Sequence, residues 1–146
     1  MKIVFGCDPN AEEFKQQLMA YVKGLGHDVT DFGSTDPIYA NVAFRAAEAT
    51  ANGEFDRAIL LCGTGIGMSI AANKVKGAYA ACIHDIYQAQ RAELSNNANV
   101  ITMGAQVIGI ELAKMMVKEY LGVTFDQNSR SGSKVRRITD YENGIG

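Results

Sequence analysis

One cysteine, Cys62, stands directly before a glycine-rich loop that reads Gly63-Thr64-Gly65-Ile66-Gly67. Glycine lets a backbone approach a ligand closely, and free backbone N–H groups at a following helix N-terminus favour negative charge. Removing a proton next to a carbonyl needs a base, and it also needs donors for the enediolate oxygen that develops. A thiol followed by this loop supplies both parts. We therefore predict an acid–base site here and place Cys62 and Thr64 among its catalytic residues.

Polar residues also stand at the ends of other short apolar runs. Asp8 follows the first run and His84 follows the fourth, while Asn96 lies just before the fifth. Ligands of an open parallel sheet bind beyond the carboxyl ends of its strands, so we predict that Asp8 and His84 contact substrate. For His84 a position in the core remains an equal alternative. Cys82, inside its predicted strand, has the pattern of a small buried hydrophobic residue. Cys7 favours a structural role, with a role in the site as its alternative.

The chain changes character from Thr124 onward, where Asp126–Lys134 reads DQNSRSGSK before a helix-like VRRITDYE. A polar segment of this kind does not belong to a core, and we predict that residues 124–146 dock on a partner subunit. Arg130 and Lys134 would by default be solvated. Their clustering in the tail nevertheless suits the capture of a phosphate across an interface.

Short apolar runs rich in β-branched residues alternate with longer amphipathic stretches. The predicted strands are Lys2–Gly6, Asp28–Phe32, Arg57–Leu61, Ala78–Ile83 and Val100–Met103. The predicted helices are Ala11–Leu25, Tyr39–Asn52, Gly67–Val75, Ile86–Leu94 and Ala105–Leu121. The repeating order predicts an α/β fold over residues 1–146: one doubly wound (Rossmann-like) domain with a five-stranded parallel sheet and helices on both faces.

Composition excludes several classes of function. The formal net charge is −2, which leaves no basic field to hold nucleic acid or an anionic membrane. No apolar run approaches the roughly 20 residues that cross a bilayer. Three cysteines without a C-x-x-C spacing predict neither a disulfide framework nor a zinc site. We expect a cytoplasmic protein that needs no metal or cofactor.

Four stretches resemble the ribose-5-phosphate isomerase B and galactose-6-phosphate isomerase family. They are the GCD that ends at Asp8, ILLCGTGIGMSIAANKVKG (59–77), NNANVITMGAQVIGIELAK (96–114), and the late pair Arg130 and Lys134. The resemblance implies a metal-free aldose–ketose isomerase that works as a homodimer or dimer of dimers, with active sites shared between subunits.

The resemblance also implies residue roles. It makes Cys62 the group that moves the proton between C1 and C2 of a small phosphorylated sugar. Amides at Gly63, Gly67 and Asn96 would stabilise the enediolate, and Asp8 would hold substrate hydroxyls. Arg130 and Lys134 match residues that grip the phosphate from the partner subunit.

Two positions depart from the family pattern. Pro9 follows Asp8, where the family usually has a histidine near the phosphate. Ser95 stands where the pentose-phosphate enzymes carry the histidine assigned to ring opening, so it joins Cys62 and Thr64 among the predicted catalytic residues. A serine hydroxyl barely ionises and does not open a ring unaided. An aldotetrose 4-phosphate has no ring to open, because its O4 is esterified.

Further stretches resemble the subgroup of this family that isomerises tetrulose 4-phosphates. They are IYAN (38–41), TGIG (64–67), HDIYQAQRAELSNNA (84–98) and FDQNSRS (125–131). The predicted reaction is therefore the conversion of D-erythrulose 4-phosphate to D-erythrose 4-phosphate.

Three other functions share part of this sequence pattern. An isomerase of ribose 5-phosphate and ribulose 5-phosphate needs the same cysteine and loop. A non-catalytic phosphosugar-binding module needs the loop and the basic tail but not the thiol. A dinucleotide-dependent enzyme would use Asp85 as its ribose-binding acid, but the G-x-G-x-G spacing is not the dinucleotide fingerprint and the loop does not follow the first strand.

Overall fold

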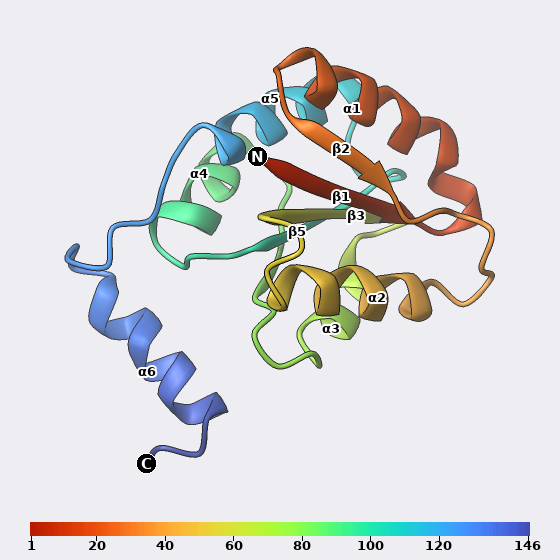
Figure 1. The fold of residues 1–146 in the computed structure, drawn as a ribbon. Coiled ribbons are helices and arrows are strands. Elements are labelled where there is room, and N and C mark those ends of the chain that lie inside the picture. Colours follow the sequence, from red (N-terminus) through yellow and green to blue (C-terminus); the bar gives the residue numbers. More distant parts are fainter.

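A computed structural model of the chain describes all 146 residues and contains one five-stranded, fully parallel sheet (Figure 1). The strands are β1 (Lys2–Cys7), β2 (Asp28–Asp31), β3 (Arg57–Cys62), β4 (Ala80–Cys82) and β5 (Val100–Gly104). The helices are α1 (Glu12–Gly24), α2 (Tyr39–Ala51), α3 (Ile66–Ala72), α4 (Ile86–Leu94), α5 (Ile110–Leu121) and α6 (Gly132–Glu142), with a short 3-10 turn η1 (Pro9–Ala11). The predicted fold class is confirmed.

The strand order is β2-β1-β3-β5-β4. The chain adds β2 on one side of β1 and then adds β3, and later β4 and β5, on the other side. The direction of winding therefore switches between β1 and β3. In the ladders, Cys7 pairs with Leu61 and Cys62 pairs with Gly104. The carboxyl ends of β1 and β3 therefore flank the switch point, where open α/β sheets bind ligands.

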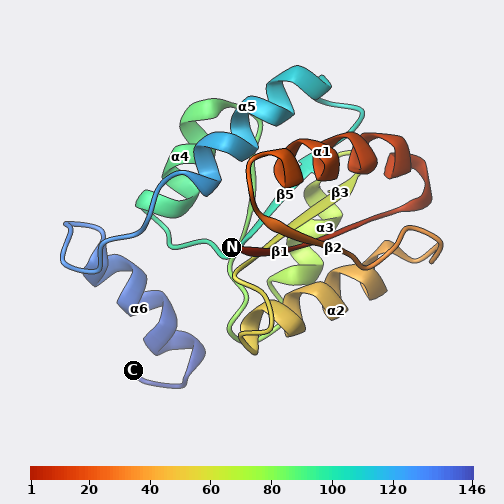
Figure 2. The same cartoon turned by 45° about the horizontal axis from the view of Figure 1, so that its top comes forward.

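Helices cover both faces of the sheet. Figure 2 shows α1, α4 and α5 on one face and α2 and α3 on the other. Alternate residues of the central strands enter opposite cores: Ile59 and Leu61 face α1, α4 and α5, whereas Leu60 and Cys62 face α2 and α3. Burial on both faces explains why these strands read as unbroken apolar runs. None of the helices combines the length and the apolar character that crossing a membrane requires.

Most element boundaries lie within one residue of the predicted ones, and three differ by more. α3 ends at Ala72, three residues before the predicted Val75. β4 begins at Ala80 rather than Ala78, because the N–H of Tyr79 donates to the Asn99 side chain at 2.8 Å instead of to a strand neighbour. α5 begins five residues later than predicted. Residues 105–108 form a turn in which two N–H groups donate to the carbonyl of Gly104.

The helix α6 stands apart from the body of the molecule (Figure 1). The helix-like pattern was predicted from Val135, and the helix begins three residues earlier. The far end of α6 is held by Glu142, whose carboxylate accepts hydrogen bonds from the N–H of Gly77 and the hydroxyl of Tyr79. Ile138 and Tyr141 leave 53% and 77% of their surface exposed, so the helix packs little of its apolar side against its own chain.

Candidate active site

Cys62 is the last residue of β3, and only 4% of its surface is exposed. Its Sγ accepts a hydrogen bond from the backbone N–H of Gly65 at 3.1 Å. Gly65 has a φ of 80°, and a Cβ there would lie 2.8 Å from the backbone carbon of Met103. Only glycine fits this left-handed, crowded position, so the loop can curl around the sulfur.

The loop is fastened from the neighbouring strand as well. The buried hydroxyl of Thr102, in β5, donates to the carbonyl of Gly65 at 2.7 Å. The hydroxyl of Thr64 accepts from the N–H of Ile66 at 3.2 Å and lies at the surface. Cys62 and Thr64 are thus brought together as predicted, with the thiol in the floor of the loop and the threonine on its rim.

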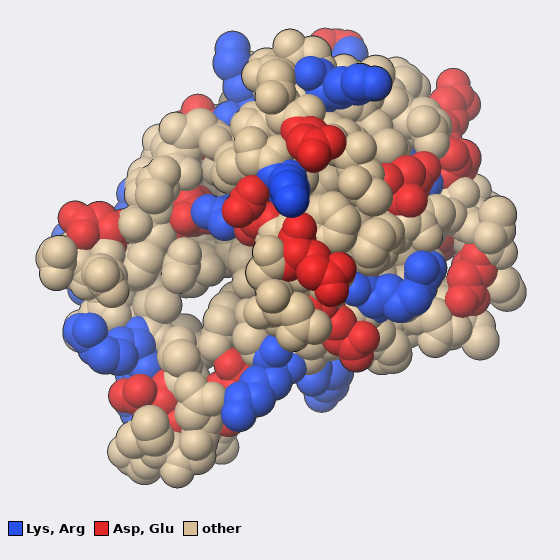
Figure 3. All heavy atoms as spheres, in the orientation of Figure 1, with Lys and Arg blue, Asp and Glu red and all other residues tan.

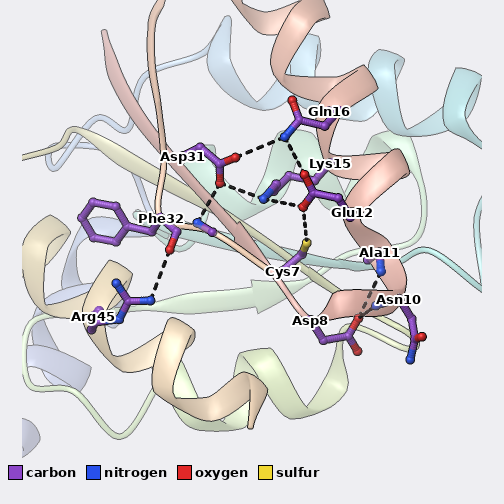
Figure 4. Close-up of polar contacts among 11 residues, drawn as sticks. Cys7, Asp8, Asn10, Ala11, Glu12, Lys15, Gln16, Asp31, Phe32 and Arg45 are labelled. Atoms are coloured by element: carbon purple, nitrogen blue, oxygen red, sulfur yellow. Dashed lines mark hydrogen bonds and ion pairs between the residues drawn. The ribbon is translucent and has the colours of Figure 1, made fainter. Parts of the chain in front are cut away.

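Asp8 lies beside this loop, because its N–H donates to the carbonyl of Leu61 at 3.1 Å. Its Oδ1 accepts the N–H groups of Asn10 and Ala11 at 3.0 and 3.1 Å, which caps the η1 turn (Figure 4). Oδ2 has no protein partner. One carboxylate oxygen therefore fixes the turn, and the other remains free for a ligand.

A buried lysine supports the same turn from behind (Figure 4). Lys15 is fully buried, and its Nζ lies 2.7 Å from Asp31 Oδ1 and 2.8 Å from Glu12 Oε2. Burial alone would lower the pKa of Lys15, but its hydrogen bonds to the two carboxylates raise it. The hydrogen bond from Lys15 is the main reason that the pKa of Glu12 falls to about 2.

Cys7 lies next to this cluster, and its Sγ lies 3.8 Å from Glu12 Oε2. Burial raises the pKa of the Cys7 thiol to about 12. Cys7 therefore stays protonated and neutral, in keeping with the structural role expected for it.

Two residues that the sequence analysis did not single out as site residues also border the loop. A Cβ on Gly67 would overlap the hydroxyl of Tyr39, the first residue of α2, and a Cβ on Gly63 would lie 3.2 Å from the side chain of Gln106. The sequence carries no signal for either contact, because each depends on how α2 and the β5–α5 turn fold over the loop.

Four other predicted site residues lie at the opposite, amino-terminal edge of the sheet. They are Ser95, Asn96, Arg130 and Lys134. The segment that follows α4 reaches this edge, where the carbonyl of Asn99 accepts from the N–H of Ala58 at the start of β3. A pocket of about 350 Å³ opens there between α4 and the start of α6. Its polar lining consists of Arg91, Ser95, Asn96, Arg130, Ser131 and Lys134, together with the hydroxyl of Tyr87. We call it the basic pocket.

A buried carboxylate anchors the tail that forms one wall of the basic pocket. Glu93 Oε1 accepts from the N–H of Phe125 at 3.0 Å, and Oε2 lies 2.9 Å from Arg57 Nη2. Burial raises the pKa of Glu93, and Arg57 opposes that effect. These contacts within the chain therefore fix the position of the tail relative to α4.

His84 follows β4 at the carboxyl edge, and its side chain is exposed without a hydrogen-bond partner. β5 separates β4 from β3. His84 thus lies two strand spacings, roughly 10 Å, from the strand that carries Cys62. The structure places it on the correct edge but outside the loop.

One chain therefore holds two half-sites at opposite edges of its sheet. The carboxyl edge offers a thiol, backbone N–H groups and a free carboxylate oxygen, which suit proton transfer next to a carbonyl. The amino edge offers a pocket lined by cations, which suits an anion. No three His, Cys, Asp or Glu side chains converge as a metal site would require.

Several known proteins are similar to this chain in sequence or in fold. The sequence model of the family described as Ribose/Galactose Isomerase matches residues 3–138. The chain is 47% identical to D-erythrulose-4-phosphate isomerase 2 of Mycolicibacterium smegmatis, over 97% of each chain. It is 46% identical to D-erythrulose-4-phosphate isomerase of Pectobacterium atrosepticum, over 97% of this chain and 95% of that protein. Its structure is similar to that of type B ribose 5-phosphate isomerase from Trypanosoma cruzi, with a TM-score of 0.92, 33% identity and 99% of each chain covered.

Proposed function

The chain belongs to the family described as Ribose/Galactose Isomerase, and we propose that it interconverts D-erythrulose 4-phosphate and D-erythrose 4-phosphate. The observation that supports isomerase chemistry most directly is the Gly65 N–H donated to Cys62 Sγ at 3.1 Å. The tetrulose substrate is supported by the two relatives named D-erythrulose-4-phosphate isomerase, each matched over nearly its whole length.

In the proposed mechanism Cys62, as a thiolate, removes a proton from C1 of the ketose. The electron pair of the broken C–H bond forms the C1–C2 double bond, and the carbonyl oxygen on C2 becomes the enediolate oxygen. Cys62 then returns the proton to C2. The proton of the O1 hydroxyl passes to the oxygen on C2, so that O1 becomes the aldehyde oxygen and C2 carries the new hydroxyl. Atoms and charge balance without any co-reactant.

Backbone N–H groups of the glycine loop stabilise the enediolate in this mechanism. Gly63 directly follows Cys62, and Gly67 lies in the first turn of α3. Donors already in place when charge develops lower the barrier most. Asp8 holds substrate hydroxyls through its free Oδ2. Thr64, on the rim of the loop, is placed to exchange protons with the sugar oxygens.

We also propose that a complete site needs two chains. The basic pocket and the thiol lie at opposite edges of one sheet, so Arg130 and Lys134 reach a phosphate beside Cys62 only if they come from a partner subunit. α6 is separated from the body of its own chain, and its Ile138 and Tyr141 side chains are exposed. Both features support docking of residues 124–146 on that partner. A two-fold homodimer, alone or paired into a dimer of dimers, gives two such shared sites.

The proposed enzyme works without a metal ion in the cytoplasm. Backbone donors take the role that a Lewis acid plays in metal-dependent isomerases. All three cysteines are free, and Cys62 must remain a thiol to act as base.

One assay tests this function. Purified protein is given D-erythrulose 4-phosphate, ribulose 5-phosphate and a ketohexose 6-phosphate, each with and without excess chelator, and aldose formation is followed by NMR. We expect the highest kcat/KM for D-erythrulose 4-phosphate, unchanged by the chelator. No turnover of any phosphate would refute the enzyme. Activity lost in chelator and restored by a divalent ion would refute the metal-free mechanism.

A further inference from the structure

The basic pocket holds three cations and no carboxylate. Arg91, Arg130 and Lys134 line it, and none of the three takes part in an ion pair within the chain. Like charges that converge in a concave pocket repel one another unless an anion lies between them. Figure 3 shows the opening between α6 and the rest of the molecule, with lysine and arginine side chains along α6.

Arg91 differs from the two tail cations because a neighbour fixes its guanidinium. Its Nε donates to Ser95 Oγ, one helical turn further along α4, at 2.6 Å. The two Nη groups have no protein partner. A guanidinium held at Nε presents its paired Nη groups as a fork, which matches the oxygen atoms of a phosphate.

Arg91 also lies on the side of the pocket nearest Asn96. The carbonyl of Arg91 accepts a hydrogen bond from Asn96 Nδ2 at 2.8 Å. Both residues line an adjoining hollow along β4, which Arg130 and Lys134 do not reach. Arg91 therefore lies beside Asn96 and lines a hollow that the tail cations do not line.

We propose that Arg91, oriented by Ser95, is a third ligand of the substrate phosphate and sets the preference for a four-carbon substrate. This inference rests on the proposed function, together with the enediolate contact that the family resemblance implies for Asn96. A phosphate on C4 lies one carbon closer to the enediolate than a phosphate on C5. A cation on the Asn96 side meets the nearer phosphate, whereas Arg130 and Lys134 serve both.

Ser95 acquires a role in this arrangement that needs no ionisation. It is a positioning residue: its small side chain lets the guanidinium approach, and its oxygen accepts the Nε–H. A larger side chain at this position, such as histidine, would displace the guanidinium. The pair of Arg91 and Ser95 thus favours the short substrate at the place where ring-opening enzymes carry an imidazole.

The first experiment measures binding of inorganic phosphate by calorimetry to the assembled full-length Cys62→Ala protein, so that turnover plays no part. We compare it with Arg91→Gln, Ser95→Ala and Arg136→Gln in the same background. Arg136 is a matched control, since it lies exposed on α6 outside the basic pocket. We expect the Kd of phosphate to rise at least tenfold for Arg91→Gln, about threefold to tenfold for Ser95→Ala, and less than twofold for Arg136→Gln. An unchanged Kd for Arg91→Gln would overturn the proposal.

The second experiment measures kcat and KM for D-erythrulose 4-phosphate and ribulose 5-phosphate with Cys62 intact. For Arg91→Gln we expect the ratio of the two kcat/KM values to fall at least tenfold, mainly through a higher KM for the tetrulose. Ser95→Ala should shift KM in the same direction while kcat and its pH profile stay unchanged. An equal loss on both substrates would overturn the selective role of Arg91, and a kcat loss for Ser95→Ala would overturn its positioning role.

Arg91→Lys keeps the charge and guards against misfolding of the glutamine variant. We expect it to bind phosphate more tightly than Arg91→Gln but to discriminate less than wild type, because a lysine has no fork to be held by Ser95. Discrimination equal to wild type would overturn the proposal. The two hypotheses fail separately: a wild-type protein inactive on tetrulose phosphate refutes the proposed function, whereas the phosphate titration still tests Arg91.

Discussion

The Sγ of Cys62 and the backbone nitrogen of Gly65 lie 3.1 Å apart, so the loop that follows the thiol folds back and donates to it. The chain contains a second strand-end cysteine, Cys7, on the adjacent strand. Cys7 faces the opposite core and has a carboxylate, Glu12, as its neighbour in place of a loop N–H. The two cysteines therefore differ in what surrounds the sulfur: Cys62 Sγ accepts a hydrogen bond from a loop N–H, whereas Cys7 Sγ lies beside a carboxylate.

Replacing Cys62 by alanine tests this directly. We expect kcat to fall by about 10²–10⁴, the contribution of a positioned acid–base group, while phosphate binding is kept. Cys82→Ala is the comparison variant. It removes a thiol that ends β4, which β5 separates from the strand of Cys62, and whose Sγ lies 3.9 Å from the carbonyl of Thr64. It should retain near-normal activity. Steady-state kinetics and phosphate calorimetry supply the two measurements. A Cys62→Ala protein with more than a tenth of wild-type kcat would rule out the thiol as base.

The contact between Gly67 and Tyr39 leads to a second prediction. A methyl group on Gly67 would overlap the tyrosine hydroxyl, so Gly67→Ala must push the loop or the ring aside. Displacement of an active-site group by about 1 Å costs on the order of 10² in rate, and we expect that loss in kcat/KM. Gly109→Ala is the control, since a Cβ there meets no atom within 4 Å. Adding Tyr39→Ala to Gly67→Ala should recover part of the loss. No recovery would show that the loop itself is distorted.

The buried Lys15 predicts how stability depends on pH. Its hydrogen bond is the main cause that lowers the pKa of Glu12 from 4.5 to about 2. A lowered folded-state pKa stabilises the fold above pH 4.5, and this contribution disappears as the pH falls toward 2. Lys15→Met should lower the free energy of unfolding at pH 7 by about 1–3 kcal/mol and flatten its decline below pH 4.5. Urea unfolding at pH 7, 5 and 3, with the exposed Lys23→Met as control, provides the check. An unchanged acid decline would assign it to other groups.

The sheet and its helices were predictable because the periodic apolar pattern reports which faces are buried. The boundaries were less so, since β4 is shortened by the Asn99 side chain and the start of α5 is delayed by a turn at Gly104. The thiol and its loop were predictable because they are consecutive residues, Cys62 to Gly67. A short sequence motif predicts a site when the groups that form the site are neighbours in the chain.

Contacts between distant segments were not predictable. Nothing in the sequence indicates that Tyr39 covers Gly67, or that Lys15 is buried between two carboxylates. The role proposed for Arg91 was not predictable either. Its partner Ser95 is close in the sequence, but the pocket that Arg91 lines forms only where α4 meets the tail. The family resemblance groups Asn96 with the glycine loop, whereas the structure places it in the basic pocket at the other edge of the sheet.

The separation of the two half-sites predicts complementation between inactive proteins. Cys62→Ala lacks the base and Arg130→Ala lacks a phosphate ligand, so each homodimer should be nearly inactive. A mixed dimer contains one site with both defects and one site with neither, if each site takes its parts from two chains. Mixing the two proteins under conditions of subunit exchange should therefore restore activity, up to about a quarter of wild type in an equal mixture. Exchange shown by mass spectrometry without recovered activity would refute the shared site.

The last prediction concerns the length of the substrate. Ribose 5-phosphate is largely a furanose, and opening its ring benefits from a group whose pKa lies near neutrality, such as histidine. Ser95 is not such a group, and in the structure its oxygen is already bonded to Arg91. A four-carbon aldose phosphate has no furanose to open. We therefore expect kcat/KM for D-erythrose 4-phosphate to exceed that for ribose 5-phosphate by at least tenfold, about 1.4 kcal/mol of transition-state discrimination.

His84 carries the imidazole at the carboxyl edge that could open a ring in place of the missing histidine, so His84→Ala is the informative variant. It should leave the activity on D-erythrose 4-phosphate within about twofold of wild type. If ribose 5-phosphate is instead the better substrate and His84→Ala abolishes only that activity, His84 opens the ring and the tetrose assignment is wrong.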